Sequence, residues 1–245
     1  MAKFNIAHMY PDLMNLYGDR GNLICLKRRI EWSGHTCSIQ TIHLGEELDY
    51  KEIDMLFMGG GSDREQILVY RDLLARADKL KEMIDNGLPV LCICGAYQLL
   101  GTAYHASDGT VMDGLGFYNF NTIGEKKRLI GNILIESQLG ESKVEVVGFE
   151  NHGGRTFLND PDLDPFGKVI KGFGNNGADR TEGIKYKNLI GTYLHGPLLP
   201  KNPSMADWYI AAMASRKGIE INSPSDNQIE NFARQQVKEK IIARR

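Results

Sequence analysis

The chain has 245 residues, of which 42% are hydrophobic and 24% charged, so it is long enough to bury a substantial core and its composition argues against wholesale disorder. With 29 Lys and Arg against 31 Asp and Glu, the formal net charge is −2, which indicates no general affinity for nucleic acid or an anionic membrane. The sequence shows no signal peptide and no apolar run long enough to span a bilayer. The four cysteines are too irregularly spaced for a disulfide framework or a structural zinc site, so we expect a cytoplasmic protein without a bound metal.

The first half of the chain alternates strand-like and helix-like segments. In chain order, the strand-like runs are 4–10, 37–44, 54–61 and 89–94, and the helix-like runs are 20–34 and 64–87. The last strand-like run, PVLCIC, is apolar throughout, as expected where helices cover both faces of a sheet. This order predicts an α/β fold with a mostly parallel central sheet and helices on both faces.

The second half is richer in strand-like runs separated by turn residues. These runs are 115–124, 128–137, 143–151, 168–175 and 188–196. Two helices are expected after them, at roughly 203–217 and 226–243. We predict one domain over 1–220 and a C-terminal helix within 221–245. Its apolar stripe is expected to pack on the domain, and docking on a partner is the alternative.

Residues 88–101, LPVLCICGAYQLLG, contain two cysteines two positions apart. A nucleophile elbow sets its reactive residue on a sharp turn between a strand and a helix, with small residues two positions before and after it. Cys94 fits, because Cys92 and Ala96 flank it and Gly95 follows directly, whereas Cys92 itself would lie inside the strand. The start of a helix also favours a thiolate. Two buried core cysteines are the more common arrangement, but the pattern favours Cys94 as a nucleophile.

A thiolate nucleophile usually works with a histidine. Among the six histidines, His195 ends an apolar strand-like run just before Gly196 and Pro197, and His152 lies in FENHGGRT at another strand end. The carboxyl ends of strands are where α/β sheets place their sites. These two histidines are therefore the candidate bases, and the other four are more typical of surface or core positions.

Three glycines, at 59–61, follow the strand-like run DMLFM. Such a run indicates backbone that turns tightly or approaches a ligand closely. The chain contains no G-x-x-x-x-G-K-[ST] loop, which argues against a nucleotide site of that kind. The remaining interpretations are an ordinary tight turn and a turn whose N–H groups face an oxyanion.

Taken together, CICGAYQLLG, GFENHGGRT and GTYLHG resemble the class I, or triad-type, glutamine amidotransferases, and more narrowly their cobyric acid synthase-like branch. With MGGGSDREQ, RLIGNILIES, FGNN and KNLIGTYLHGP added, the chain is most similar to the glutaminase subunits of lipid II isoglutaminyl synthases. The resemblance extends from the N-terminal strand to about residue 220. It implies one amidotransferase domain with extra strands in its second half.

The resemblance also implies a reaction and a partner. L-Glutamine would be hydrolysed to glutamate and ammonia, and the ammonia would pass, within a heterodimer, to a Mur-ligase-like subunit. That subunit would use ATP to amidate the D-glutamate of the lipid II stem peptide in peptidoglycan synthesis. ATP and Mg would then belong to the partner, this chain would need no cofactor, and it would meet lipid II only indirectly.

By the same resemblance, Cys94 would attack the carboxamide of glutamine. His195 would move a proton from the thiol to the departing ammonia. Backbone N–H groups of Gly95 and of the glycine turn, at Gly60, would hold the developing oxyanion.

Three further residues receive binding roles from the resemblance. Arg128 would hold the α-carboxylate of glutamine, for which a guanidinium fork is well suited, although the residues alone indicate only a solvated Lys-Lys-Arg run. Gln98 would line the pocket one helical turn after the nucleophile. His152 would form part of the pocket wall, with a role as the base as its alternative.

One position departs from the triad pattern. Triad amidotransferases carry a glutamate two residues after the histidine, and Pro197 stands there in this chain. The sequence thus predicts a Cys-His dyad, whose weaker base implies low free glutaminase activity without the partner. Glu150 and Asn151 are the candidates to orient the imidazole instead.

Two other functions compete with this reading. One is an amidotransferase of the same branch in cobalamin-type biosynthesis, which the absence of both extra length and a P-loop disfavours. The other is a non-hydrolytic thiol sensor or chaperone on a similar sheet, with Cys94 as an oxidisable residue. That function predicts neither the histidine motif nor the arginine motif.

Overall fold

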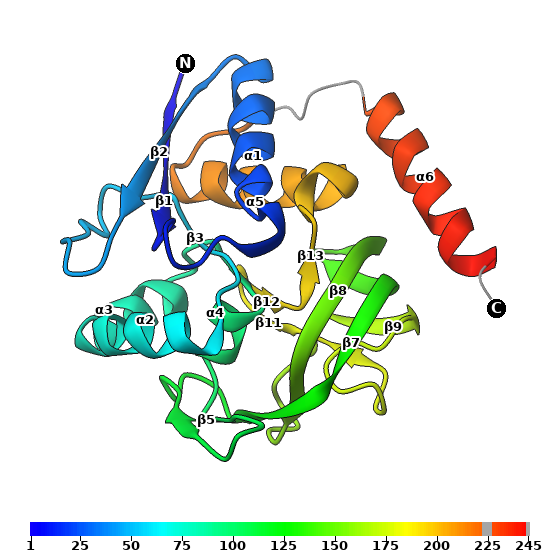
Figure 1. Ribbon diagram of the computed structural model, residues 1–245. Helices are drawn as coiled ribbons and strands as arrows, with labels where there is room; N and C mark the ends of the chain where they lie inside the picture. The colour runs from blue at the N-terminus through cyan, green and yellow to red at the C-terminus, as the bar shows by residue number, and fades with distance from the viewer. Residues whose placement is uncertain (222–226, 244–245) are drawn as a thin grey trace.

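A six-stranded sheet in the order β11-β12-β4-β3-β1-β2 forms the centre of the computed structural model, which describes residues 1–221 and 227–243 (Figure 1). The strands are β1 (Lys3–Met9), β2 (Thr36–Ile42), β3 (Met55–Met58), β4 (Val90–Ile93), β11 (Ile184–Tyr186) and β12 (Leu189–Thr192). Neighbouring strands pair in parallel except β11 and β12. The prediction of a mostly parallel central sheet is confirmed.

The helices between these strands cover opposite faces. They are α1 (Gly21–Trp32), α2 (Asp63–Ala75) and α3 (Ala77–Asp85), and α5 (Pro203–Arg216) follows the last strand. The connection from β1 through α1 to β2 runs toward one edge of the sheet, whereas that from β3 through α2 and α3 to β4 runs toward the other. Because both crossovers are expected to be right-handed, α1 and the α2–α3 pair lie on different faces, as Figure 1 shows.

The segment predicted as one helix over 64–87 is two helices, and that prediction was wrong in this respect. Arg76 separates them, with a non-helical φ of −118° and ψ of 10°. Its guanidinium donates to the carbonyl oxygen of Glu46 and to the carboxylate of Asp72. Glu46 lies outside the segment, so the apolar periodicity of the segment reveals neither this contact nor the break beside it.

A second sheet occupies the other half of the molecule. Its strands are β5 (Ala103–His105), β6 (Val111–Asp113), β7 (Phe120–Leu139), β8 (Ser142–Leu158), β9 (Gly167–Lys171), β10 (Thr181–Glu182) and β13 (Leu194–His195). The predicted runs 115–124 and 128–137 are joined in β7, with a register shift between Gly124 and Leu129 where it pairs with β8. Strand β13 pairs with β8, His195 opposite Phe149. This pairing brings the second sheet to the carboxyl edge of the first.

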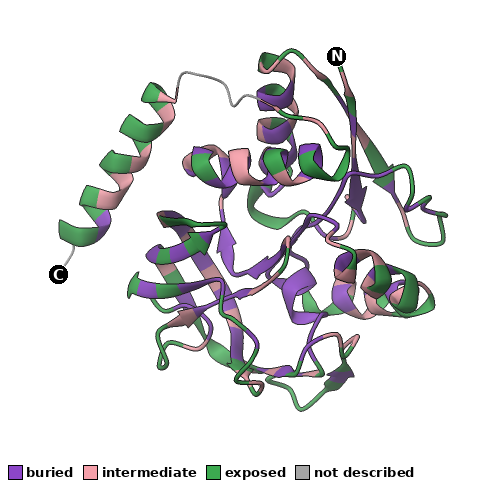
Figure 2. Cartoon of the chain, turned by 180° about the vertical axis from the view of Figure 1, so that it is seen from behind, coloured by how far each residue is buried: buried purple, intermediate pink, exposed green. Residues whose placement is uncertain are grey.

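The core follows the central sheet, whose strands are largely buried (Figure 2). All four residues of β3 and all four of β4 are buried. The segment that leads to Cys94 is therefore fixed on both faces by packed side chains, which is a rigid support for a reactive residue.

The C-terminal helix α6 (Gln228–Ala243) lies against β7 and β8. Ile241 is buried against Leu134 and Val147, and Lys238 pairs with Glu145. Residues 222–226 and 244–245 of the predicted segment 221–245 lie outside the described residues. Over residues 1–221 and 227–243, no helix is both long and apolar enough to cross a membrane.

Candidate active site

Cys94 stands at a sharp turn between β4 and the short helix α4 (Gly95–Gln98). Its φ of 52° and ψ of −105° lie in a region that non-glycine residues rarely adopt, which is the strained backbone of a nucleophile elbow. Its own N–H donates to the carbonyl oxygen of Thr192 at 2.8 Å, which ties the turn to β12. Cys92, in contrast, is fully buried inside β4, and burial raises the pKa of its thiol far above the usual range.

His195 meets Cys94 across Gly60. A Cβ placed on Gly60 would lie 3.0 Å from Cε1 of His195 and 3.4 Å from Cβ of Cys94, so a side chain at this position would crowd the imidazole. Burial lowers the pKa of His195, but the neighbouring Asp19 and Cys94 outweigh burial and raise the pKa to about 10. The imidazole therefore favours the protonated state beside the thiol.

Asp19 is a neighbour of His195 that sequence reasoning missed. Both carboxylate oxygens lie 3.2 Å from Nδ1 of His195, and both side chains are fully buried. Asp19 follows the 3-10 helix η1 (Leu16–Gly18) and is 176 residues from the histidine in sequence. The ring of Tyr17, from the same loop, packs edge-on against the imidazole with 4.8 Å between ring centroids. No motif spacing signals a pair so distant, so only the fold reveals it.

The glycine turn is arranged differently from the expectation for an oxyanion site. The N–H of Gly60 donates to Oδ2 of Asp19 at 3.1 Å, and the carbonyl oxygen of Gly60 accepts from the N–H of Leu16 at 3.1 Å. The turn lies beside Cys94 as predicted, but in this structure the Gly60 N–H points to a carboxylate rather than to a free space. Gly95 opens α4 and packs on the side chain of Gln66.

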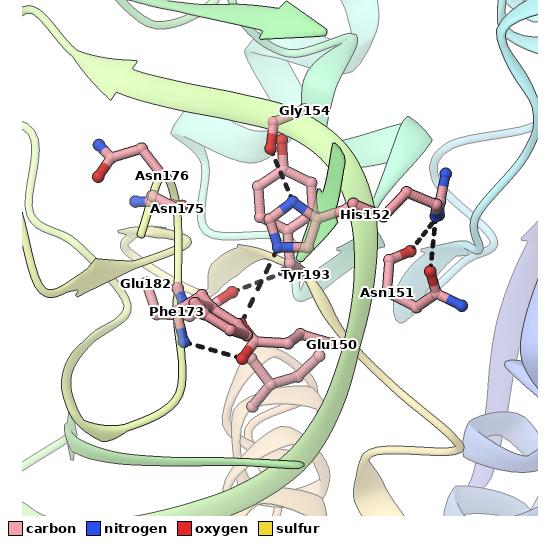
Figure 3. Close-up of polar contacts among 12 residues, drawn as sticks. Glu150, Asn151, His152, Gly154, Phe173, Asn175, Asn176, Glu182 and Tyr193 are labelled. Atoms are coloured by element: carbon pink, nitrogen blue, oxygen red, sulfur yellow. Dashed lines mark hydrogen bonds and ion pairs between the residues drawn. The ribbon is translucent and has the colours of Figure 1, made fainter. Parts of the chain in front are cut away.

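Neither Glu150 nor Asn151 is bonded to His195. The carboxylate of Glu150 accepts from the backbone N–H groups of Phe173 and Gly174 at 2.8 and 2.9 Å (Figure 3). The side-chain oxygen of Asn151 accepts from Nε of Arg128 at 2.7 Å. Neither of the two candidates therefore orients the imidazole in this structure, because both side chains are engaged elsewhere.

His152 belongs to a separate buried network. Its ring stacks on that of Tyr193 with centroids 3.7 Å apart and planes 5° from parallel (Figure 3). Its Nδ1 lies 2.7 Å from the carbonyl oxygen of Gly154, and its Nε2 is 4.0 Å from the Glu150 carboxylate. Burial outweighs these contacts and lowers the pKa of His152.

A cavity of about 560 Å³ opens in front of the elbow. Cys94, Gln98, Arg128 and His152 all line it, so the structure brings together four of the residues singled out in the sequence. Arg128 is held by Asn151, whose side-chain and backbone oxygens accept from Nε and Nη2 at 2.7 and 2.6 Å.

The cavity also carries groups that sequence analysis did not single out. Asp63, Arg64, Glu125 and Lys126 supply charges of both signs. Gln66 is 2% exposed and its Oε1 has no hydrogen-bond partner among the described residues. Gln66 lies in GGGSDREQ, a segment quoted above for its family resemblance, but nothing in its spacing marks the glutamine. Within the described ranges, no group of three or more His, Cys, Asp and Glu side chains is placed to hold a metal ion.

Comparison with known proteins agrees with this site. Residues 5–203 match the CobB/CobQ-like glutamine amidotransferase domain. The chain is 43% identical over its whole length to the lipid II isoglutaminyl synthase (glutamine-hydrolyzing) subunit GatD of Staphylococcus aureus, covering 97% of that protein. It is 39% identical to the subunit of the same name from Streptococcus pneumoniae, with 93% of this chain and 87% of that protein covered. A probable cobyric acid synthase of Methanothermobacter thermautotrophicus is 30% identical, but this chain covers only 39% of its length.

Solved structures share the fold at low sequence identity. PurLQS from Thermotoga maritima superposes with a TM-score of 0.55 at 17% identity, covering 88% of this chain and 99% of that one. The glutaminase domain of Trypanosoma brucei CTPS with bound acivicin gives 0.52 at 12% identity, covering 93% and 98%. The architecture is thus that of glutamine amidotransferase domains, and the resemblance seen in the motifs is confirmed.

Proposed function

Because this chain belongs to the CobB/CobQ-like glutamine amidotransferases, we propose that it is the glutaminase subunit of an enzyme that amidates the D-glutamate of the lipid II stem peptide. The observation that carries the proposal is the strained elbow of Cys94, which meets His195 at Gly60 and opens on a charged cavity. The near full-length likeness to two subunits named for lipid II supports the pathway.

The reaction follows from the arrangement of the two side chains. The thiol of Cys94 passes its proton to the imidazole of His195, the resulting thiolate attacks the carboxamide carbon of L-glutamine, and the C=O electrons move to oxygen. When the tetrahedral adduct collapses, the C–N bond breaks and the protonated His195 gives its proton to the leaving nitrogen, which departs as ammonia. Water, deprotonated by the now neutral imidazole, cleaves the thioester, and glutamate leaves with the thiol restored.

The cavity suits an α-amino acid. Arg128 is fixed by Asn151, so its guanidinium is ready to bind the α-carboxylate without first losing much side-chain freedom. Asp63 lies on the same cavity wall and supplies a negative charge for the α-ammonium. Gln98 is positioned by its hydrogen bond to the hydroxyl of Tyr193 at 3.0 Å.

The proposal assigns the remaining chemistry to a partner. The ammonia passes to a Mur-ligase-like subunit in a heterodimer, and that subunit binds ATP, Mg and lipid II, while this chain needs no cofactor. The two relatives with near full-length coverage are both named as subunits, which supports a partner.

The two cysteines provide the test. Cys94→Ala should abolish ammonia release from L-glutamine by the chain with its partner, while Cys92→Ser, the matched thiol two residues away, should retain most of it. Ammonia and amidated lipid II are both measured. Full ammonia release by Cys94→Ala would rule out the thiol mechanism. Ammonia release without amidation of lipid II, with the partner and ATP present, would support the glutaminase activity and contradict lipid II as the acceptor of the ammonia.

A further inference from the structure

Asp19 is buried completely and faces His195 with both carboxylate oxygens at 3.2 Å from Nδ1. A carboxylate in this position accepts the Nδ1 proton, so it fixes which imidazole nitrogen is protonated and which way the ring points. Nε2, the nitrogen left to exchange protons with the thiol and the leaving group, has no hydrogen-bond partner among the described residues.

We propose that Asp19 is the positioning carboxylate of His195, so that the N-terminal loop supplies the acid of a Cys94–His195–Asp19 relay. This inference rests on the proposed glutaminase function. It replaces the predicted dyad, because Pro197 stands at the position where triad amidotransferases carry their glutamate. A carboxylate from another part of the chain reaches the same nitrogen.

The other acids around the site are occupied. Glu150 is bonded to the backbone of Phe173 and Gly174. Glu182 accepts from the hydroxyl of Thr192 and the N–H of Tyr193. Neither has a hydrogen bond to His195 within the described part of the chain, which leaves the imidazole to Asp19.

Asp19 also acts on the glycine turn. Its Oδ2 accepts from the N–H of Gly60, and Leu16, three residues before it, donates to the carbonyl oxygen of the same glycine. One short loop therefore positions both the imidazole of His195 and the peptide group of Gly60. For Gly60 to donate to an oxyanion, its peptide must first turn away from Asp19, and the lack of a side chain makes that rotation feasible.

The pH behaviour of His195 depends on the groups that face it. They are the carboxylate of Asp19, the thiol of Cys94, the ring of Tyr17 and, at longer range, Glu182. Asp19 and Cys94 each raise the pKa of His195, whereas burial lowers it. Removing the Asp19 charge without changing its shape should therefore lower the pKa of the imidazole.

The experiment uses Asp19→Asn and Asp19→Glu in the full chain, with Asp12→Asn as the matched control. Asp12 is an exposed acid of the same N-terminal region that pairs with a different histidine, His43. We expect Asp19→Asn to lower kcat for ammonia release with the partner by roughly 10²–10⁴-fold, the scale of losing a triad acid, with a much smaller change in KM. Asp19→Glu should recover part of the loss, and Asp12→Asn should match the wild type.

Two readouts on the chain alone separate positioning from a structural role. NMR titration should show a lower pKa for His195 in Asp19→Asn. Alkylation of Cys94 by iodoacetamide at a fixed neutral pH should be slower in Asp19→Asn than in the wild type. An unchanged pKa of His195 together with an unchanged alkylation rate of Cys94 would overturn the proposal, even if kcat fell through loss of folding. If the wild type releases no ammonia with its partner, the glutaminase function fails, while these two readouts still decide whether Asp19 sets the imidazole.

Discussion

His195 and His152 are both almost completely buried, and each has an Nε2 without a hydrogen-bond partner among the described residues. They differ in what contacts the other nitrogen. His195 faces the carboxylate of Asp19 and its pKa rises to about 10, whereas His152 faces the carbonyl oxygen of Gly154 and its pKa falls. The same side chain at the same depth is thus charged in one place and neutral in the other.

The comparison shows that direct contact with a carboxylate, rather than burial, separates the two histidines. Glu150 is only 4.0 Å from His152, but two backbone N–H groups already satisfy its oxygens, and the stacked ring of Tyr193 holds the imidazole in place. A cationic imidazole suits proton delivery to a leaving amine, and a neutral, stacked one suits a pocket wall.

The largest expected effect comes from removing each histidine in turn. His195→Ala should lower kcat for ammonia release by about 10³-fold or more, because both proton transfers depend on it. His152→Ala should act mainly on KM, because it removes part of the cavity wall. Steady-state kinetics with the partner distinguish the two. A lower kcat in His152→Ala than in His195→Ala would reverse the assignment of the base.

Arg128 tests the side of the cavity next to His152. Arg128→Ala should raise KM for glutamine by roughly 10–100-fold, the loss expected for a charge-assisted hydrogen bond, and leave kcat nearly unchanged. Asn151→Ala should give a smaller rise, because it frees the guanidinium without removing it. Lys127→Ala, an exposed neighbouring cation that does not line the cavity, is the control. An unchanged KM in Arg128→Ala rejects the carboxylate-binding role.

Glu182 extends the comparison to a buried acid whose carboxylate is bonded to Thr192 and Tyr193 rather than to a cation among the described residues. Burial raises its pKa from the ordinary 4.5 to about 8, more than its hydrogen bonds to Tyr193 and Thr192 lower it. The unfolded chain loses this proton near pH 4.5 and the folded chain near pH 8. Glu182 therefore lowers the free energy of unfolding progressively between pH 4.5 and pH 8, and the loss is complete above pH 8.

Glu182→Gln should therefore raise the Tm at pH 9 by several degrees and leave it nearly unchanged at pH 4, since one unit of pKa corresponds to about 1.4 kcal/mol. The amide oxygen can still accept from Thr192 and Tyr193. Thermal unfolding at several pH values measures the effect, and Glu141→Gln, at an exposed turn, should show no such trend. A Tm gain that does not depend on pH contradicts the titration of Glu182.

The sequence predicts the parallel half of the fold well, because its strands are short, largely apolar runs and its helices carry apolar periodicity and are followed by Gly34 and Gly87. It fails where tertiary contacts decide. Arg76 separates two helices and bonds to Glu46 outside the segment, and two predicted runs join in β7 across a register shift; neither feature has a local signal in the sequence.

The candidate site also has a part that the sequence predicts and a part that only the fold reveals. The elbow depends on residues adjacent in sequence, and the pattern of small residues predicts the turn that the structure places at Cys94, with Cys92 inside β4. The contact of Asp19 with His195 joins residues 176 positions apart, and it replaces an acid that the motif places two residues after the histidine. Local motifs therefore predict the sharp turn at Cys94, and only the fold reveals the carboxylate beside the imidazole.

The smallest expected effect on activity concerns the ring beneath His152. Tyr193→Phe keeps the stacked ring but removes a hydroxyl that binds Gln98 and Thr156. Thr156 retains Thr122 as a partner at 2.8 Å, so the main loss falls on the buried amide of Gln98, at about 1–3 kcal/mol of stability.

Because stacking is preserved, His152 should remain neutral and kcat should stay close to that of the wild type, with only a small rise in KM. Tyr118→Phe is the matched control, since the Tyr118 hydroxyl is buried without a hydrogen-bond partner among the described residues and its removal should not destabilise the fold. Denaturant unfolding of both variants measures the difference. If Tyr193→Phe instead abolished ammonia release, the network around His152 would take part in the chemistry, and the contrast between the two histidines would be one of degree rather than of role.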